Sequence, residues 1–189
     1  LVVRDADILG RMAARGLASV YVSVTTLDRK LARSMEPRAA SPERRLESIR
    51  RLTGAGIPVG VAFAPVIPGL NDHEMETVLS AAVEAGATRA MYVTLRLPLE
   101  IRDLFEEWLE QERPDRAARV MSLVRQTRGG KDYDSRWGAR MRGTGPVAEL
   151  VGARFAVACR RLGLNRERPR PDTTLFRKPP AAGDQMDLF

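Results

Sequence analysis

Cysteine and histidine are nearly absent from this chain of 189 residues, which contains one of each. The single cysteine, Cys159, excludes an internal disulfide and any site that needs several thiolates from this chain. The single histidine, His73, follows Asp72 at the expected start of a helix. We therefore expect His73 to lie on the surface in a first helical turn, and not to act as a catalytic base.

Long hydrophobic runs are also absent. No stretch approaches the roughly 18 apolar residues of a membrane span, and the opening LVVRDADILG carries charges where a signal peptide would be apolar. With 44% hydrophobic residues, the composition is that of a globular protein. We expect a cytoplasmic protein without a membrane partner. Because the chain starts inside an apolar run and without Met, we also expect it to be the C-terminal portion of a longer protein.

Acidic residues are scarce in one part of the chain. Residues 111–170 hold 15 Lys and Arg against 6 Asp and Glu, while the whole chain has a net charge of +7. The arginines between residues 113 and 142 are Arg113, Arg116, Arg119, Arg125, Arg128, Arg136, Arg140 and Arg142. Guanidinium groups suit phosphate, so segment 113–142 predicts a surface that binds DNA. A solvated basic surface without a partner remains the alternative.

What the first hundred residues do contain is a repeated alternation of strand and helix patterns. Runs typical of strands occur at residues 1–5, 18–26, 57–67 and 90–97. Helical spacing of apolar residues follows each run, at residues 7–16, 41–54, 71–86 and 99–112. Four such units at about 30-residue spacing predict a parallel sheet with right-handed crossovers, either open or closed into a barrel.

The strand sequences place polar residues on one face. Ser23 and Thr25 share a face of the second strand, and Tyr92, Thr94 and Arg96 share a face of the fourth, with aliphatic residues between them. A sheet buried on both faces would favour continuous apolar runs. We therefore expect helices to cover the aliphatic face, and the polar face to line a barrel interior that holds a polar ligand.

Beyond residue 112 the pattern changes to helices and a proline-rich end. Helical patterns span residues 114–128 and 147–162, separated by a loop rich in Gly and Arg, and prolines from residue 169 onward indicate an extended tail. We divide the chain into a barrel part (1–112), a basic helical extension (113–165) and a tail (166–189).

Several separated motifs resemble one family. They are VYVSVTTLD (20–28), MEPR (35–38), APVIPGLND (64–72), RQTRGGKDYDSR (125–136) and the terminal GDQMDLF (183–189). In this order they resemble the radical S-adenosylmethionine (radical SAM) superfamily, and most closely its subgroup of spore photoproduct lyase-like and DNA repair photolyase-like proteins. The resemblance implies an α/β fold, with the last four βα units of a partial (β/α)6 barrel in this chain.

The resemblance also implies an iron–sulfur enzyme. Its members hold a 4Fe-4S cluster by three cysteines in a C-x-x-x-C-x-x-C loop and reductively cleave S-adenosylmethionine to a 5′-deoxyadenosyl radical, here with an implied lyase role in DNA repair. This chain departs from that pattern, because it lacks the motif and has only Cys159. Since the cluster ligands are thiolates, we expect this chain alone to bind no cluster and to be inactive, with the longer protein supplying the cysteines.

The resemblance implies a cofactor site at the carboxyl ends of the strands. The residues expected to bind S-adenosylmethionine are Ser23, Thr25, Val66, Ile67, Thr94 and Arg96. Ordinary strand propensity is the alternative for the two strand hydroxyls. An inward Arg96 is costly to bury alone, so we expect it to pair with a carboxylate or phosphate of a ligand. Asp5, Asp28 and Asp72 are the alternative partners within the chain.

The last five residues resemble the peptide by which bacterial DNA-processing enzymes bind the replication sliding clamp. They are Gln185, Met186, Asp187, Leu188 and Phe189. A glutamine amide suits a polar subsite, and a Leu-Phe pair fills an apolar pocket; packing of this pair against the chain's own barrel is the alternative. A second function therefore stays open, that of a non-catalytic adaptor that binds DNA and the sliding clamp.

Overall fold

A three-stranded parallel sheet lies at the centre of the computed structural model, which describes residues 2–167 and 172–175. The strands are β1 (Val20–Ser23), β2 (Val59–Val66) and β3 (Arg89–Thr94), in the order β1-β2-β3. Val61 of β2 pairs with Val22 on one side and with Ala90 on the other. The βα pattern thus gives the parallel arrangement that the sequence predicted.

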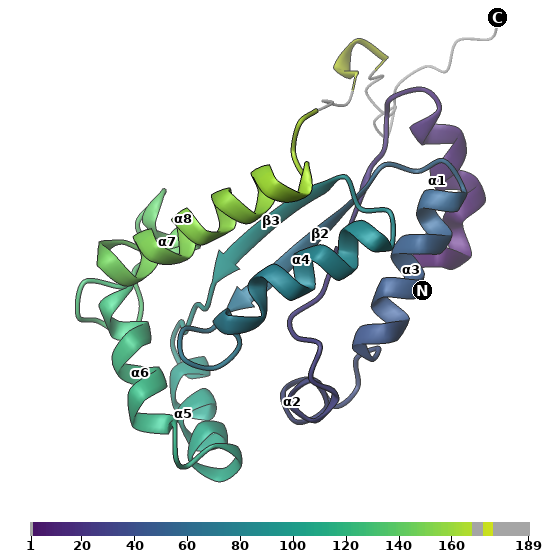
Figure 1. Cartoon of the computed structure of the whole chain (residues 1–189). Helices are drawn as coiled ribbons and strands as arrows, with labels where there is room; N and C mark the ends of the chain where they lie inside the picture. Colours follow the sequence, from purple (N-terminus) through teal and green to yellow (C-terminus); the bar gives the residue numbers. More distant parts are fainter. Residues whose placement is uncertain (1, 168–171, 176–189) are drawn as a thin grey trace, which may run out of the picture.

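Helices cover one face of this sheet. They are α3 (Pro42–Gly54), α4 (Met75–Glu84) and α8 (Gly145–Leu162), and α1 (Ala6–Ala13) packs Ala6, Leu9 and Ala13 against the same core. Figure 1 shows α4 and α8 side by side in front of β2 and β3, and α3 contacts β1 and β2. Alternate strand residues, among them Val59, Val61 and Phe63, are fully buried beneath these helices, which is the amphipathic pattern expected of a half-covered sheet. None of the helices described is long and apolar enough to cross a membrane.

A second hydrophobic cluster lies beyond the carboxyl ends of the strands. It is formed with α2 (Arg29–Met35), α5 (Ile101–Glu112) and α6 (Ala117–Gln126). Leu31, Leu109 and Val120 meet there around Ile67. The short helix α7 (Ala139–Arg142) contacts β3 from the connection between α6 and α8. The loops that follow the strands are therefore held against helices.

Local signals explain where several helices begin and end. Ser41 accepts a hydrogen bond from the N–H of Arg44 at the start of α3, and Pro42 occupies the first turn. Gly163 ends α8 in the left-handed conformation, with φ of 73°. Helix α2 was not expected, although Asp28 caps it by accepting from the N–H groups of Lys30 and Leu31. Its seven residues are too few to show a clear apolar period.

The expected first strand is wrong. Val2–Asp5 forms a 3-10 helix that continues directly into α1, so the described residues contain three strands and not four. Val2, Val3 and Leu9 pack against the main core from this helical stretch. A run of three apolar residues is compatible with both a strand and a helix. Its packing against α3 favours the helix. Arg4 and Asp5 form an ion pair on this helix.

Candidate functional site

The hydroxyls of Ser23 and Thr25 converge at the carboxyl edge of the sheet. Both donate to the main-chain carbonyl of Ala64, at 3.0 Å from Ser23 Oγ and 3.3 Å from Thr25 Oγ1. Parallel strands bring their carboxyl ends to one edge, and this is the edge at which ligands bind in α/β folds. The structure therefore brings together two residues that the sequence analysis had selected, although a protein carbonyl occupies both donors.

An ion pair that the sequence analysis missed supports these hydroxyls. Arg45 Nη2 lies 2.7 Å from Glu36 Oε2, and Arg45 Nη1 donates to the carbonyl of Ser23 at 3.0 Å. The same Glu36 oxygen lies 3.4 Å from Thr25 Oγ1, so it is the alternative acceptor for the single proton of this hydroxyl. Glu36 lies in the MEPR motif, so its place in a recognised motif was the available signal. The pair fixes the end of β1 to α3.

Two polar side chains tie together the loops that follow β1 and β2. Asn71 is fully buried; its amide donates to the carbonyls of Thr25 and Pro65, and its oxygen accepts from the N–H of Ile67. Glu74 accepts from the hydroxyl of Thr26 and from the N–H of Leu27. Asn71 precedes the 3-10 helix Asp72–Glu74, but its side chain makes no cap bond and instead satisfies these buried main-chain groups.

Val66 and Ile67 lie inside the protein. Both side chains have no exposed surface, and they belong to the two separate hydrophobic clusters. The N–H of Ile67 is bonded to Asn71, and the carbonyl of Val66 accepts from Leu95. Both residues pack inside the protein at the carboxyl edge of the sheet. Their contact with a cofactor stays a prediction, and the burial of both side chains does not favour it.

The orientation expected for Tyr92 and Thr94 is wrong. Tyr92 is in register with buried Phe63, and its ring packs against Phe155 of α8 at 4.8 Å between centroids. Thr94 is 1% exposed and donates to the carbonyl of Arg142. Both side chains therefore belong to the face that the helices cover. The uncovered face carries the alternate residues, among them partly exposed Met91.

Arg96 has no acidic partner among the described residues. Its Nη2 donates to the hydroxyl of Tyr133 at 3.3 Å, its Nη1 lies 3.8 Å from Met141 Sδ, and its buried Nε has no hydrogen-bond partner. The alternative partners are engaged elsewhere. Asp5 pairs with Arg4, Asp28 caps α2, and Asp72 accepts from Gly69 and pairs with Arg154. Arg96 thus keeps unused capacity for an anion.

Arg128 is buried and not part of a basic surface. It is 1% exposed, and its Nη atoms donate to the carbonyls of Thr94, Leu95, Ala139 and Arg140 at 2.6 to 3.2 Å. Burial lowers the pKa of its guanidinium below the usual value, and nearby Arg96 lowers it further. The expectation that this arginine faces DNA is therefore wrong. Composition alone could not separate it from the exposed arginines of segment 113–142.

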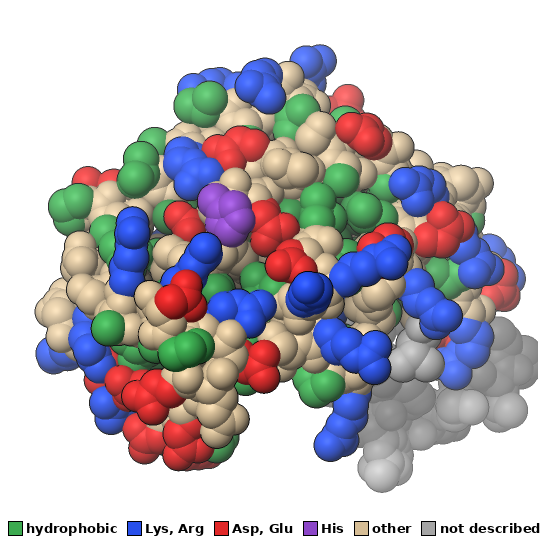
Figure 2. Space-filling model, turned by 60° about the horizontal axis from the view of Figure 1, so that its bottom comes forward, with side chains coloured by type: hydrophobic (Ala, Val, Ile, Leu, Met, Phe, Trp, Pro, Cys, Tyr) green, Lys and Arg blue, Asp and Glu red, His purple; other side chains and the backbone are tan. Residues whose placement is uncertain are grey.

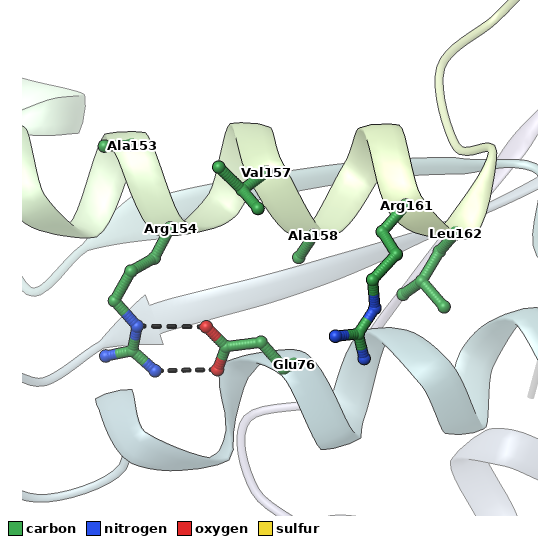
Figure 3. Close-up of a pocket in the computed structure, with 7 residues that line it drawn as sticks. All are labelled: Glu76, Ala153, Arg154, Val157, Ala158, Arg161 and Leu162. Atoms are coloured by element: carbon green, nitrogen blue, oxygen red, sulfur yellow. Dashed lines mark hydrogen bonds and ion pairs between the residues drawn. The ribbon is translucent and has the colours of Figure 1, made fainter.

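A groove between α4 and α8 lies on the outer side of these helices. It has a volume of about 320 Å³ and is lined mainly by apolar atoms (Figure 3). At one end Arg154 binds Glu76 through two hydrogen bonds of 3.0 and 2.7 Å, which lower the pKa of the Glu76 carboxyl and raise that of Arg154. No residue predicted to bind a cofactor lines this groove, so we assign the Arg154–Glu76 pair to the packing of α8 on α4.

The two remaining predicted features fall outside the sheet edge. His73 is exposed, as expected, and Figure 2 shows the histidine on the surface between basic and acidic side chains. Gln185, Met186, Asp187, Leu188 and Phe189 lie outside the described residues.

The donor set of this chain does not fit a cubane iron–sulfur cluster. Cys159 is the single thiol of the sequence; it is buried in α8, and burial raises its pKa. Among residues 2–167 and 172–175, no group of three His, Cys, Asp or Glu side chains is arranged to hold a metal ion. A cluster bound by three thiolates would need cysteines from outside this sequence.

Comparisons with known proteins agree with the motif resemblance. The family model of the radical SAM superfamily matches residues 2–82. This segment contains β1, β2 and the loops built around Ser23, Thr25 and Asn71. The subgroup of spore photoproduct lyase is not addressed by this match.

Curated relatives of similar sequence are longer than this chain. Uncharacterized proteins of Mycobacterium tuberculosis and Mycobacterium bovis are each 32% identical over 127 residues, which is 66% of this chain and 37% of the relative. An uncharacterized protein of Acidianus two-tailed virus is 40% identical over 68 residues, or 36% of this chain and 22% of the viral protein. No solved structure matches significantly. The chain thus spans little more than a third of the mycobacterial relatives.

Proposed function

We propose that this chain is part of a radical SAM enzyme that reductively cleaves S-adenosylmethionine and acts on DNA, in the manner of the spore photoproduct lyase-like subgroup. The observation that carries the first part is the radical SAM family match over residues 2–82, which includes the sheet edge where two hydroxyls converge. The cluster and its three cysteines are supplied by sequence outside this chain, because Cys159 is its single thiol.

Ser23, Thr25 and Arg96 are the residues that would hold S-adenosylmethionine. That ligand carries ribose hydroxyls and a carboxylate, and the two strand hydroxyls can turn from Ala64 to such groups. The unpartnered Nε of Arg96 fits an anion. We assign no step to the cluster in this chain, because its donor set does not fit one.

The DNA part of the proposal is supported by charge. Residues 111–170 carry most of the basic excess of the chain. Several of these arginines, such as Arg125 with Asp132 and Arg136 with Asp134, are neutralised by nearby carboxylates, but Arg119, Arg140 and Arg142 form no ion pair within the described residues. Arginines without acidic partners are available to phosphates, and binding of this kind weakens steeply with salt.

The enzymatic proposal is tested with the longer protein that contains this sequence. The protein is reconstituted with iron and sulfide in the absence of oxygen, reduced, and incubated with S-adenosylmethionine, and the products are separated by chromatography and identified by mass. We expect 5′-deoxyadenosine to form with the reductant and not without it. A reconstituted protein that holds a cluster and still forms no 5′-deoxyadenosine would contradict the proposal and favour the non-catalytic adaptor.

The clamp-binding role of residues 185–189 is a separate proposal. We expect a chain that lacks these five residues to lose its binding to the bacterial sliding clamp, while its thermal unfolding is unchanged. Equal binding with and without the five residues would exclude the role.

A further inference from the structure

One tryptophan of this protein is almost fully exposed beside arginines that have no acidic partner. Trp137 is 86% exposed, and the guanidinium of Arg140 lies over its ring at 4.3 Å from the centroid. An exposed indole ring beside a guanidinium group offers a flat apolar face, which is the arrangement on which unstacked bases stack. Arg140 covers one face of the ring and leaves the other face open.

The surroundings of Trp137 are basic. We call the group Arg96, Trp137 and Arg140 the arginine–tryptophan surface. Its members are joined through α7, because Arg96 contacts Met141 and Arg140 stacks on Trp137. Neither of its two arginines forms an ion pair with a carboxylate in the described part of the chain. The nearby Asp134 is already bound by Arg136.

Buried contacts hold this surface in place. Arg128 donates to the carbonyls of Ala139 and Arg140, and through its other Nη atom to Thr94 and Leu95. The N–H of Thr144 donates to the carbonyl of Thr127 at the far end of α7. Helix α7 is therefore fixed to the carboxyl end of β3. The arginine–tryptophan surface lies next to the sheet edge that holds the candidate site.

We propose that the arginine–tryptophan surface binds a DNA strand with an unpaired base, which stacks on the open face of Trp137 while Arg96 and Arg140 contact its phosphates. Aromatic rings that stack bases beside guanidinium groups are the usual means of binding single strands. A base in an intact duplex cannot offer its face to the ring. This inference rests on the DNA part of the proposed function and adds that the strand must carry an unpaired nucleotide.

The test uses the full chain and a fluorescein-labelled oligothymidylate of about 12 nucleotides, with binding followed by anisotropy at about 50 mM salt. We expect Trp137→Leu to raise Kd about tenfold and Arg140→Gln about threefold. Leu150→Ser, on the exposed side of α8, and Arg51→Gln, an exposed arginine of α3 outside segment 113–142, are the matched controls and should change Kd less than about twofold. Circular dichroism checks that each variant is folded.

A second measurement reports on Trp137 directly. The chain has two tryptophans, and Trp108 packs on Phe105 and donates to the carbonyl of Ser34. We expect the oligonucleotide to quench the intrinsic fluorescence of the wild type, the quenching to be lost in Trp137→Leu, and a duplex of the same length to quench little.

Four outcomes would overturn the inference. Unchanged oligonucleotide binding by Trp137→Leu would exclude this surface as the binding site but would not contradict DNA binding by the protein. Equal quenching by the duplex would remove the need for an unpaired base. Binding of polyglutamate with the same Kd would show a surface for acidic proteins. A wild type that binds no oligonucleotide would also remove the DNA part of the proposed function, whereas formation of 5′-deoxyadenosine is measured independently.

Discussion

The side-chain amide of Asn71 donates to the main-chain carbonyl of Thr25 at 2.8 Å, which links the loop after β2 to the loop after β1. The same amide donates to Pro65, and its oxygen accepts from Ile67, so one buried side chain satisfies three main-chain groups. The position of the Ser23 and Thr25 hydroxyls depends on these loops.

Replacement of Asn71 by Ala should destabilise the protein strongly. The change leaves two carbonyls and one N–H without partners in a buried site, and we expect a loss of about 2–3 kcal/mol in the free energy of unfolding. Urea unfolding followed by circular dichroism measures the loss. Gln111→Ala, which removes an exposed amide from α5, is the control and should have almost no effect.

Arg128 should be needed for the structure rather than for binding. Arg128→Met removes the donors to four carbonyls at the junction of β3 and α7, and we expect it to cost about 2–4 kcal/mol of stability. Arg119→Met is the matched control on the exposed face of α6. If the two variants unfold at the same urea concentration, the buried hydrogen bonds of Arg128 do not stabilise the fold.

Asp134 should make stability depend on acid pH. Hydrogen bonds from Arg136 hold the pKa of the Asp134 carboxyl at about 2, below its usual value of 3.8. Because the carboxyl has the higher pKa in the unfolded state, the unfolded state takes up the proton first as the pH falls. The stabilisation by the Arg136–Asp134 pair is therefore present above about pH 4 and is lost as the pH falls toward 2. We expect Asp134→Asn to lose less stability than the wild type between pH 5 and pH 3, measured by urea unfolding.

The control for that comparison is Ser135→Ala, an exposed neighbour without a titrating group. It should keep the pH dependence of the wild type. An equal loss of stability in Asp134→Asn and the wild type would show that the Arg136–Asp134 pair does not form in solution.

The strand hydroxyls should affect cofactor binding in the longer protein. For the double variant Ser23→Ala, Thr25→Val we expect KM for S-adenosylmethionine to rise about thirtyfold, because each of the two lost hydrogen bonds contributes about 1 kcal/mol. Ser122→Ala, on the exposed side of α6, should leave KM unchanged. If KM stays the same and only unfolding shifts, the two hydroxyls serve only to hold Ala64.

Sequence patterns were most informative where neighbours along the chain determine the conformation. The cap at Ser41 and the left-handed Gly163 mark the ends of α3 and α8, since both act within one helical turn. The alternation of side chains in residues 57–67 predicted β2, because this pattern also depends only on neighbours along the chain. Residues 1–5 failed because an apolar run of three residues fits both periods, and a contact with α3 decided between them.

The candidate site depended more on contacts between distant segments. Ser23 and Thr25 were found because the strand pattern and the motif lie on the same residues. Glu36 and Asn71 reach that edge from other loops. Both lie in recognised motifs, but local spacing does not show which distant groups their side chains contact. The face of Thr94 was misjudged because both faces of β3 carry apolar residues, and the contact of Tyr92 with Phe155 of α8 decides which face the helices cover.

By itself the sequence determined the parallel βα order, most helix ends, the shortage of thiolates and the resemblance to radical SAM proteins, because each depends on residue type and local spacing. Only the tertiary structure decided that Arg128 is buried while Arg140 and Trp137 face solvent. An arginine has the same charge and spacing in either case. Its burial depends on whether distant carbonyls, here those of Thr94 and Leu95, are brought within reach to compensate the loss of water.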